Sequence, residues 1–155
     1  MTDEAAGGEP PLPEPYAEGE LPGSIRVAVS SNSGENLDGH FGSCERFLIY
    51  QLSPTALRLI AQRPTLAADR SDERNAARAA LIADCDILFV QSIGGPAVAK
   101  VVRAGVHPIK IAQAGPVRAI LISLQRRLLS PPPWLAKSMG VAAASLAPFR
   151  EAALS

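Results

Sequence analysis

One stretch decides the fold class of this chain: residues 87–97, ILFVQSIGGPA. Its first four residues, Ile87–Val90, are all apolar, which is typical of a strand covered on both faces of its sheet. A Gly-Gly turn follows, and Pro96 suits the first helical position because proline lacks the N–H that a helix start leaves unpaired. The stretch predicts a strand, a tight turn and a helix over about Ala97–Arg103.

A second unit of this kind follows downstream. Gly105 ends the predicted helix, Pro108–Ile111 is predicted as the next strand, and Pro116 opens a last helix from about Val117 to Leu129. Because strand–helix–strand crossovers are right-handed, the two units place parallel strands side by side, with helices on the faces of the sheet.

Upstream, the apolar pattern has a period of two. Ile25–Val29, Phe47–Leu52 and Leu57–Gln62 are therefore predicted as strands, and their short connections favour an antiparallel meander. An alanine-rich helix over Asp72–Ala83 follows. The element order βββαβαβα predicts an α/β fold, with a five-stranded mixed sheet of ribonuclease H-like topology flanked by helices.

Charge and proline content divide the chain into three parts. Residues 1–23 contain five prolines and six acidic residues but no basic one, so we expect a disordered, acidic, proline-rich arm. Residues 24–138 form the predicted domain, and residues 139–155 form a C-terminal tail. Beyond the arm the chain carries 15 basic and 9 acidic residues, a balance that suits an anionic ligand or an acidic protein surface.

The sequence argues against several classes of protein. It has no secretory signal, no apolar run near the roughly 18 residues of a membrane span, and no cysteine pair spaced for zinc, so we expect a cytoplasmic protein. A ribonuclease H-type nuclease needs several carboxylates to hold two metal ions, yet Ile25–Val29 has none. Since no catalytic triad or nucleotide-binding loop appears either, we expect neither an enzyme nor a nucleic-acid-binding protein.

The candidate site lies beyond the carboxyl ends of the parallel strands, where loops and helix N-termini converge. An imidazole and a thiolate suit iron in a sulfur-rich cluster, so His40 and Cys44 in the loop after the first strand are the candidate metal ligands. Each residue taken alone has a plainer explanation. His40 can be a loop histidine that caps a turn, and Cys44 can be a small buried residue. We expect Cys44 to be exposed enough to react with alkylating agents, and Cys85 to be buried.

Two further groups bear on this site. The backbone N–H groups of Gly94 and Gly95 open a helix and suit an anion, although a tight turn with nothing bound explains them equally well. Cys85 and His107 precede their strands, which places them at the opposite end of the sheet and excludes them from a site with His40.

Several motifs in this order resemble the NifX/NafY family, which also forms the C-terminal part of NifB. The similarity covers about residues 24–138 and is most NifX-like. Its motifs are Ile25-Arg26-Val27-Ala28-Val29-Ser30, Asp38-Gly39-His40-Phe41-Gly42, Glu45-Arg46-Phe47-Leu48-Ile49-Tyr50, Asp84-Cys85-Asp86-Ile87-Leu88-Phe89, Ile93-Gly94-Gly95-Pro96, residues 103–110 and Pro131-Pro132-Pro133-Trp134-Leu135.

The resemblance implies non-catalytic binding and carriage of the iron-molybdenum cofactor of nitrogenase, or of its iron-sulfur precursor, during nitrogenase assembly. The family's cofactor-binding histidine corresponds to His40. The predicted cofactor-binding residues are His40, Phe41, Gly42, Arg46, Gly94, Gly95 and Arg118, where the arginines balance the negative charge of the cluster. The alternative is an interaction module that binds apo-dinitrogenase or another assembly protein, through the acidic arm or the region of Trp134, without contacting the cluster.

Overall fold

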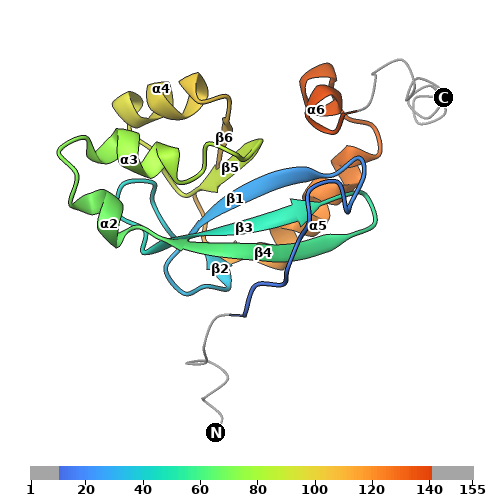
Figure 1. The fold of residues 1–155 in the computed structure, drawn as a ribbon, viewed down its shortest axis with the longest axis horizontal. Coiled ribbons are helices and arrows are strands. Elements are labelled where there is room, and N and C mark those ends of the chain that lie inside the picture. Colours follow the sequence, from blue (N-terminus) through green and yellow to red (C-terminus); the bar gives the residue numbers. More distant parts are fainter. Residues whose placement is uncertain (1–10, 141–155) are drawn as a thin grey trace, which may run out of the picture.

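The computed structural model describes residues 11–140, and Figure 1 shows its elements. They are, in chain order, β1 (Ile25–Ser31), β2 (Asn36–Leu37), β3 (Arg46–Leu52), β4 (Leu57–Pro64), α2 (Leu66–Asp69), α3 (Arg74–Ala80), β5 (Ile87–Val90), α4 (Gly95–Arg103), β6 (His107–Lys110), β7 (Gly115–Pro116), α5 (Val117–Leu128) and α6 (Pro133–Ser138).

The main sheet has five strands in the order β4-β3-β1-β5-β6. β3 pairs antiparallel with both β1 and β4, whereas β1, β5 and β6 run parallel to one another. The predicted α/β class and the five-stranded mixed sheet are therefore confirmed, including the parallel arrangement of the three strands that carry the crossovers. A two-stranded ladder, β2 with β7, lies apart from the main sheet.

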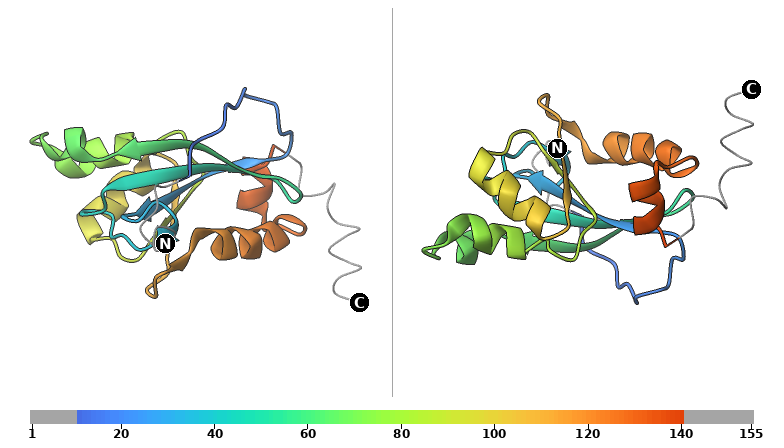
Figure 2. Two further views of the ribbon diagram at one scale, coloured as in Figure 1. Left: turned by 90° about the horizontal axis from the view of Figure 1, so that it is seen from below. Right: turned by 90° about the horizontal axis from the view of Figure 1, so that it is seen from above.

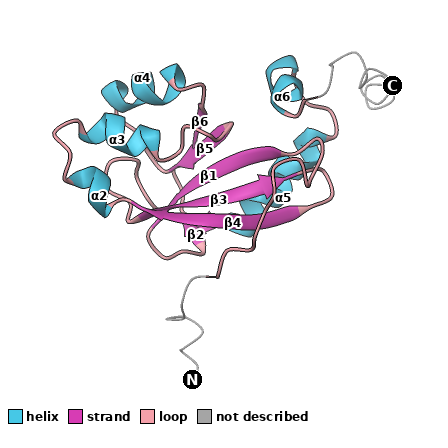
Figure 3. Cartoon of the chain, viewed as in Figure 1, coloured by secondary structure: helices cyan, strands magenta, loops and turns pink. Residues whose placement is uncertain are grey.

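The sheet separates two apolar cores because side chains alternate along β1. Val27 and Val29 pack in the core that includes α5 and α6, whereas Ala28 packs in the core that includes α3 and α4. Figure 2 shows α5 lying along one face of the sheet. In Figure 3, α2, α3 and α4 gather at one side of the sheet and α6 lies at the other. The candidate site belongs to the α3 and α4 side.

Residues 11–23 correct the prediction of a disordered arm, because this part of the chain makes defined contacts with β4 and β1. The Glu14 N–H donates to the carbonyl oxygen of Leu59 at 2.9 Å. The Tyr16 ring lies within cation–π distance of Arg58, with the guanidinium carbon 5.7 Å from the ring centroid.

Acidic residues of the same segment are held by arginines of the sheet. Arg58 pairs with Glu20 at 2.9 Å, and Arg26 pairs with Glu18. Low hydrophobicity predicted disorder, but these ion pairs with β1 and β4 are long-range contacts that composition does not reveal. Residues 1–10 and 141–155 lie outside the described residues, and so does nearly all of the predicted tail.

The elements predicted in the order βββαβαβα match the structure to within a few residues, and α6 agrees with a short helix expected around Leu135. Three further short elements were not predicted. These are α2, with four residues, and the two-residue strands β2 and β7. Among residues 11–140, no helix has the length and apolar character needed to cross a membrane.

Candidate functional site

The loop after β1 is closed by its own polar side chains. The Asp38 carboxylate accepts the Asn32 N–H at 2.7 Å and the Ser33 N–H at 3.3 Å. The Asn32 side chain in turn donates to the Asp38 carbonyl at 3.0 Å and accepts the Glu45 N–H at 2.9 Å. These bonds fix the two ends of the segment between them, so residues 39–44 form a defined turn at the edge of the sheet.

Gly39 occupies a position where only glycine fits. A Cβ built there would lie 2.6 Å from the Cβ of Cys44 and 3.1 Å from the carbonyl carbon of Ser30. The Gly39 carbonyl also accepts the Gln91 N–H at 3.0 Å. The absence of a side chain at Gly39 lets the turn pack closely against Ser30 of β1 and accept the hydrogen bond from Gln91, just after β5.

His40 is exposed and is oriented by the turn after β5. Its Nδ1 lies 2.7 Å from the Ser92 hydroxyl, and the next residue, Phe41, donates its N–H to the Ser92 carbonyl at 2.9 Å. In the tautomer in which Nδ1–H donates to Ser92, Nε2 carries the lone pair that a metal requires. Nε2 has no hydrogen bond within residues 11–140.

Arg78 of α3 holds the His40 turn from beneath, and sequence reasoning missed it. Its side chain is only 1% exposed. One nitrogen, Nη1, donates to the carbonyl oxygens of Phe41 at 2.7 Å and Cys44 at 3.2 Å, while Nε and Nη2 contact the Asp69 carboxylate at 2.8 and 2.9 Å. The available signal was an arginine with alanines on both sides, Ala76 and Ala77 before it and Ala79 and Ala80 after it, in a helix that packs on the core.

Cys44 is a buried residue, which corrects the prediction of an exposed, reactive thiol. Its side chain is 0% exposed and its Sγ lies 3.5 Å from Nη1 of Arg78. Burial raises the pKa of the Cys44 thiol, and the positive charge of Arg78 only partly opposes this effect. The thiol is thus neutral at pH 7 and lies inside the molecule, whereas His40 lies at its surface.

Phe41 and Gly42, both predicted to contact the cofactor, mainly shape the turn. The Phe41 ring is buried and lies 5.7 Å, centroid to centroid, from the Phe47 ring. The Gly42 carbonyl accepts a hydrogen bond from Arg74 of α3. The turn is therefore anchored through its backbone and one aromatic side chain, and the imidazole of His40 is exposed.

The N-terminus of α4 follows directly after the residue that contacts His40. Gly94 comes two residues after Ser92, whose hydroxyl contacts the imidazole. Gly94 and Gly95 are exposed, and no side chain caps the helix start. Uncapped N–H groups and the helix dipole make this end of α4 electropositive. The contact between His40 and Ser92 thus agrees with the single edge at which the sequence placed the histidine and the glycines.

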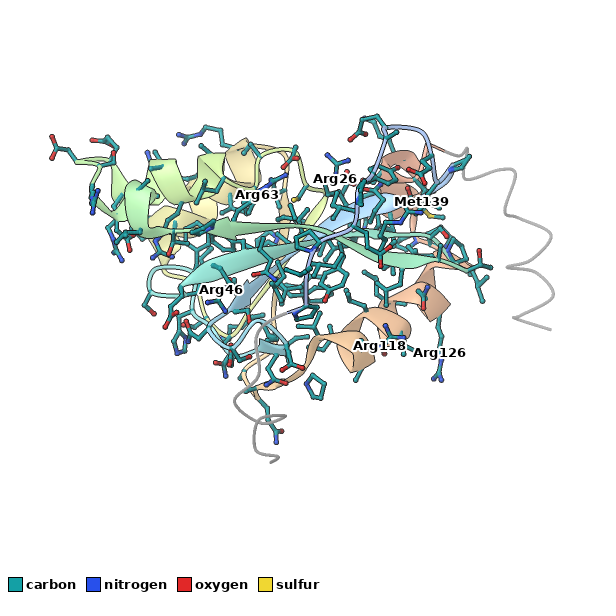
Figure 4. The ribbon with its side chains drawn as sticks, turned by 60° about the horizontal axis from the view of Figure 1, so that its bottom comes forward. Arg26, Arg46, Arg63, Arg118, Arg126 and Met139 are labelled. Carbon is teal, nitrogen blue, oxygen red and sulfur yellow. The ribbon has the colours of Figure 1, made fainter. Side chains whose placement is uncertain are left out.

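The two predicted arginines occupy different places, as Figure 4 shows. Arg46, at the start of β3, donates to the Asn32 carbonyl at 2.6 Å and contacts Glu45 at 3.6 Å, so it supports the loop after β1. Arg118 is exposed on α5 and lines a separate cavity of about 460 Å³ together with Tyr50. Of these two arginines, Arg46 is therefore the one that contacts the loop carrying the His40 turn.

Cys85 and His107 lie at the opposite ends of their strands from His40, as predicted. Cys85 is buried before β5, and His107 begins β6 and stacks on Trp134 with ring centroids 4.3 Å apart. In the described part of the chain, no three His, Cys, Asp or Glu residues come together as a metal site. Of the two predicted metal ligands, His40 is exposed and Cys44 is buried.

Comparisons with known proteins agree with the motif pattern. The family model "Dinitrogenase iron-molybdenum cofactor" matches residues 23–127. Protein NifY of Azotobacter vinelandii is 56% identical over 84% of this chain, which spans only 54% of that protein. Protein NifX of Rhodobacter capsulatus is 36% identical, with 85% of each chain covered.

A solved structure supports the fold alone. The apo form of the orange protein from Desulfovibrio gigas superposes with a TM-score of 0.53 at 17% sequence identity, covering 68% of this chain and 87% of that one. Because the family model covers most of the chain and the NifX match extends along most of its own length, the chain belongs to the dinitrogenase iron-molybdenum cofactor family.

Proposed function

We propose that this protein binds the iron-molybdenum cofactor of nitrogenase, or its iron-sulfur precursor, as cargo and carries it during nitrogenase assembly without catalysing a reaction. The observation that carries the proposal is the exposed His40 imidazole, oriented through Nδ1 by Ser92 at the start of the turn into α4. Imidazole is a good ligand for iron, and orientation through the second ring nitrogen fixes the tautomer that binds.

Charge supports the same reading. A metal–sulfur cluster of this kind is anionic, and the uncapped N-terminus of α4 at Gly94 and Gly95 offers N–H donors and the positive end of a helix dipole. Arg46 adds a cation on the loop that carries the turn. Arg118 remains a predicted contact only for a cargo large enough to extend towards α5.

Cys44 remains a predicted second ligand, but ligation requires a movement. Its buried, neutral thiol would have to lose a proton and leave the contact with Arg78 before it could bind iron. We therefore propose His40 as the primary ligand of the structure as it stands.

The remaining assignments follow the family relationship. The strand order and crossovers support a ribonuclease H-like classification of the fold. Membership of this family supports cytoplasmic localisation, with nitrogenase assembly proteins or apo-dinitrogenase as partners. We retain residues 24–138 as the functional domain.

Anaerobic titration with isolated cofactor tests the proposal. We expect a stoichiometric coloured complex with the wild-type protein, and an affinity weakened by about tenfold or more in His40→Ala, since even outer-shell partners of metal ligands contribute that much. His107→Ala is the matched control, because His107 is the second of the two histidines and lies at the far end of its strand. Equal affinity in His40→Ala and wild type would remove His40 from the site.

The competing function, partner binding without cluster binding, is favoured by one observation. Trp134 is 41% exposed and lines an apolar groove away from His40. The acidic segment is less suited to this role than predicted, because Glu14, Glu18 and Glu20 already pair with arginines of the sheet. A protein that captures its partner but never binds the cofactor would establish this reading.

A further inference from the structure

An open apolar groove lies between the edge strand β6, α5 and α6. Its volume is about 520 Å³, and its walls include Ile109, Ile111, Leu124, Trp134, Leu135 and Arg127. The large Trp134 side chain is 41% exposed although it forms one wall, so its apolar surface is only partly covered. Exposed apolar surface of this kind, beside an unpaired strand edge, is typical of a binding surface for another polypeptide.

The charges of the chain are segregated in a way that involves this groove. Residues 87–140, which supply its entire lining, contain seven basic residues and no acidic one. Residues 11–86 contain eleven acidic and seven basic residues. Six of the seven basic residues after residue 86 are exposed: Arg103, Lys110, Arg118, Arg126, Arg127 and Lys137.

None of these basic residues forms an ion pair within residues 11–140. All the ion pairs found within residues 11–140 join partners that both precede residue 87. The charged residue of the groove lining is Arg127, and complementary charge is the main determinant of which partner approaches a basic surface.

We propose that this groove docks an acidic amphipathic segment of a partner protein, with apolar side chains in the groove and carboxylates towards Arg127 and its neighbours. The proposal is independent of cluster binding, because the groove lies over the α5 core and the His40 turn over the α3 and α4 core. A helix with one apolar face fits a groove bounded by α5 and α6, by the packing that helix-in-groove complexes use.

Two other occupants fit the charges less well. Residues 141–155 contain one basic and one acidic residue and so offer no complementary charge. A second copy, presenting its acidic half to the groove, would make a head-to-tail contact, which builds a closed ring or an open filament and not a two-fold dimer.

The single tryptophan of the chain makes the test specific, because Trp134 itself lines the groove. The probe is a synthetic tryptophan-free helical peptide with leucines at i, i+3, i+4 and i+7 and glutamates on its other face. A peptide with the same leucines and lysines in place of glutamates is its control. We expect the glutamate peptide to shift the Trp134 emission of the full-length protein saturably, and the lysine peptide to leave it unchanged.

Two neighbouring arginines separate groove binding from general charge attraction. Arg126 and Arg127 are both exposed on α5, but only Arg127 lines the groove. We expect Arg127→Glu to lower the affinity for the glutamate peptide by about tenfold. Arg126→Glu should lower this affinity much less. His40→Ala should leave peptide binding unchanged, so this test can fail without affecting the cofactor titration.

Several outcomes would overturn the proposal. One is a Trp134 emission that neither peptide alters. Another is an equal loss of affinity for the glutamate peptide in Arg126→Glu and Arg127→Glu. A Trp134 emission that depends on the concentration of the protein alone would assign the groove to a second copy. An emission shifted by Phe149→Glu without any peptide would assign it to the segment 141–155.

Discussion

Arg78 links two parts of the molecule that are distant in sequence, the helix α3 and the His40 turn. A guanidinium that is 1% exposed is stable only because its charge and its N–H groups all have partners, here Asp69 and two carbonyl oxygens. The orientation of the turn therefore depends on a residue that does not itself reach the surface.

Replacing this residue tests its role. We expect Arg78→Met to lower the free energy of unfolding by about 3 kcal/mol, because the carbonyls of Phe41 and Cys44 lose a buried donor and Asp69 loses its main cation. Urea denaturation measures this loss. Arg70→Met, at an exposed position near the end of α2, is the control and should change stability little. Equal stability of the two variants would contradict the assigned role.

Two glycines of the same turn give a matched pair. Gly39→Ala should destabilise the protein by about 2 kcal/mol, because its Cβ would meet Cys44 and the backbone of Ser30. Gly42→Ala should be tolerated, since no heavy atom lies within 4 Å of its added Cβ. Alkylation at neutral pH followed by mass spectrometry gives a second readout: Cys44 should label slowly in the wild type and Gly42→Ala, and faster in Gly39→Ala.

The sequence predicted the exposed half of the site but not its buried half. His40, Gly94 and Gly95 were placed at one edge by topology alone, and the contact between His40 and Ser92 agrees with that placement. Which side of a short turn faces inward depends on packing against β1 and α3, so the burial of Cys44 could not be predicted from its neighbours in sequence.

At the level of elements, the Asp84 side chain connects the turn before β5 with the strands β1 and β4. It lies in the turn before β5 and accepts hydrogen bonds from Arg63 of β4 at 2.6 and 2.9 Å and from Arg26 of β1 at 3.1 Å. The hydrogen bonds from Arg63 are the main cause that lowers the pKa of Asp84 to about 2.

This shift predicts a specific pH dependence of stability. Because the folded pKa lies below the value of about 3.9 for a free aspartate, the stabilisation is present above that value and is lost as the pH falls through about 2. Asp84→Asn should therefore flatten the stability curve between about pH 4 and 2, an effect moderated by the 42% exposure of the side chain. Thermal unfolding across this range, with the exposed Asp72→Asn as control, measures it; unchanged slopes would contradict the prediction.

Long periodic segments were predictable, whereas short paired ones were not. The strands and the helices α4 and α5 carry a pattern of two or 3.6 residues over their own length. The two-residue strands β2 and β7 exist only because Asn36 and Leu37 meet Pro116 and Gly115 across the molecule. Such an element has no local signal, and the same holds for the contacts that place residues 11–23 on β4.

For the molecule as a whole, the sheet keeps two candidate functions apart. The His40 turn packs over the core that contains Phe41 and Val101, and the groove with Trp134 lies over the core that contains Leu121 and Leu135. Changes in one core do not have to pass through the other. A protein organised in this way can bind a ligand at one site and a protein at the other simultaneously.

The segment along β4 has a consequence for aggregation. β4 is an edge strand, and an uncovered edge strand invites strands of other molecules to pair with it. The segment covers part of this edge through the Glu14 N–H, while Pro11, Pro13 and Pro15 bring no N–H that an incoming strand could use. Its outer side is therefore a poor template for β-sheet growth, which helps to keep the protein from aggregating at high concentration.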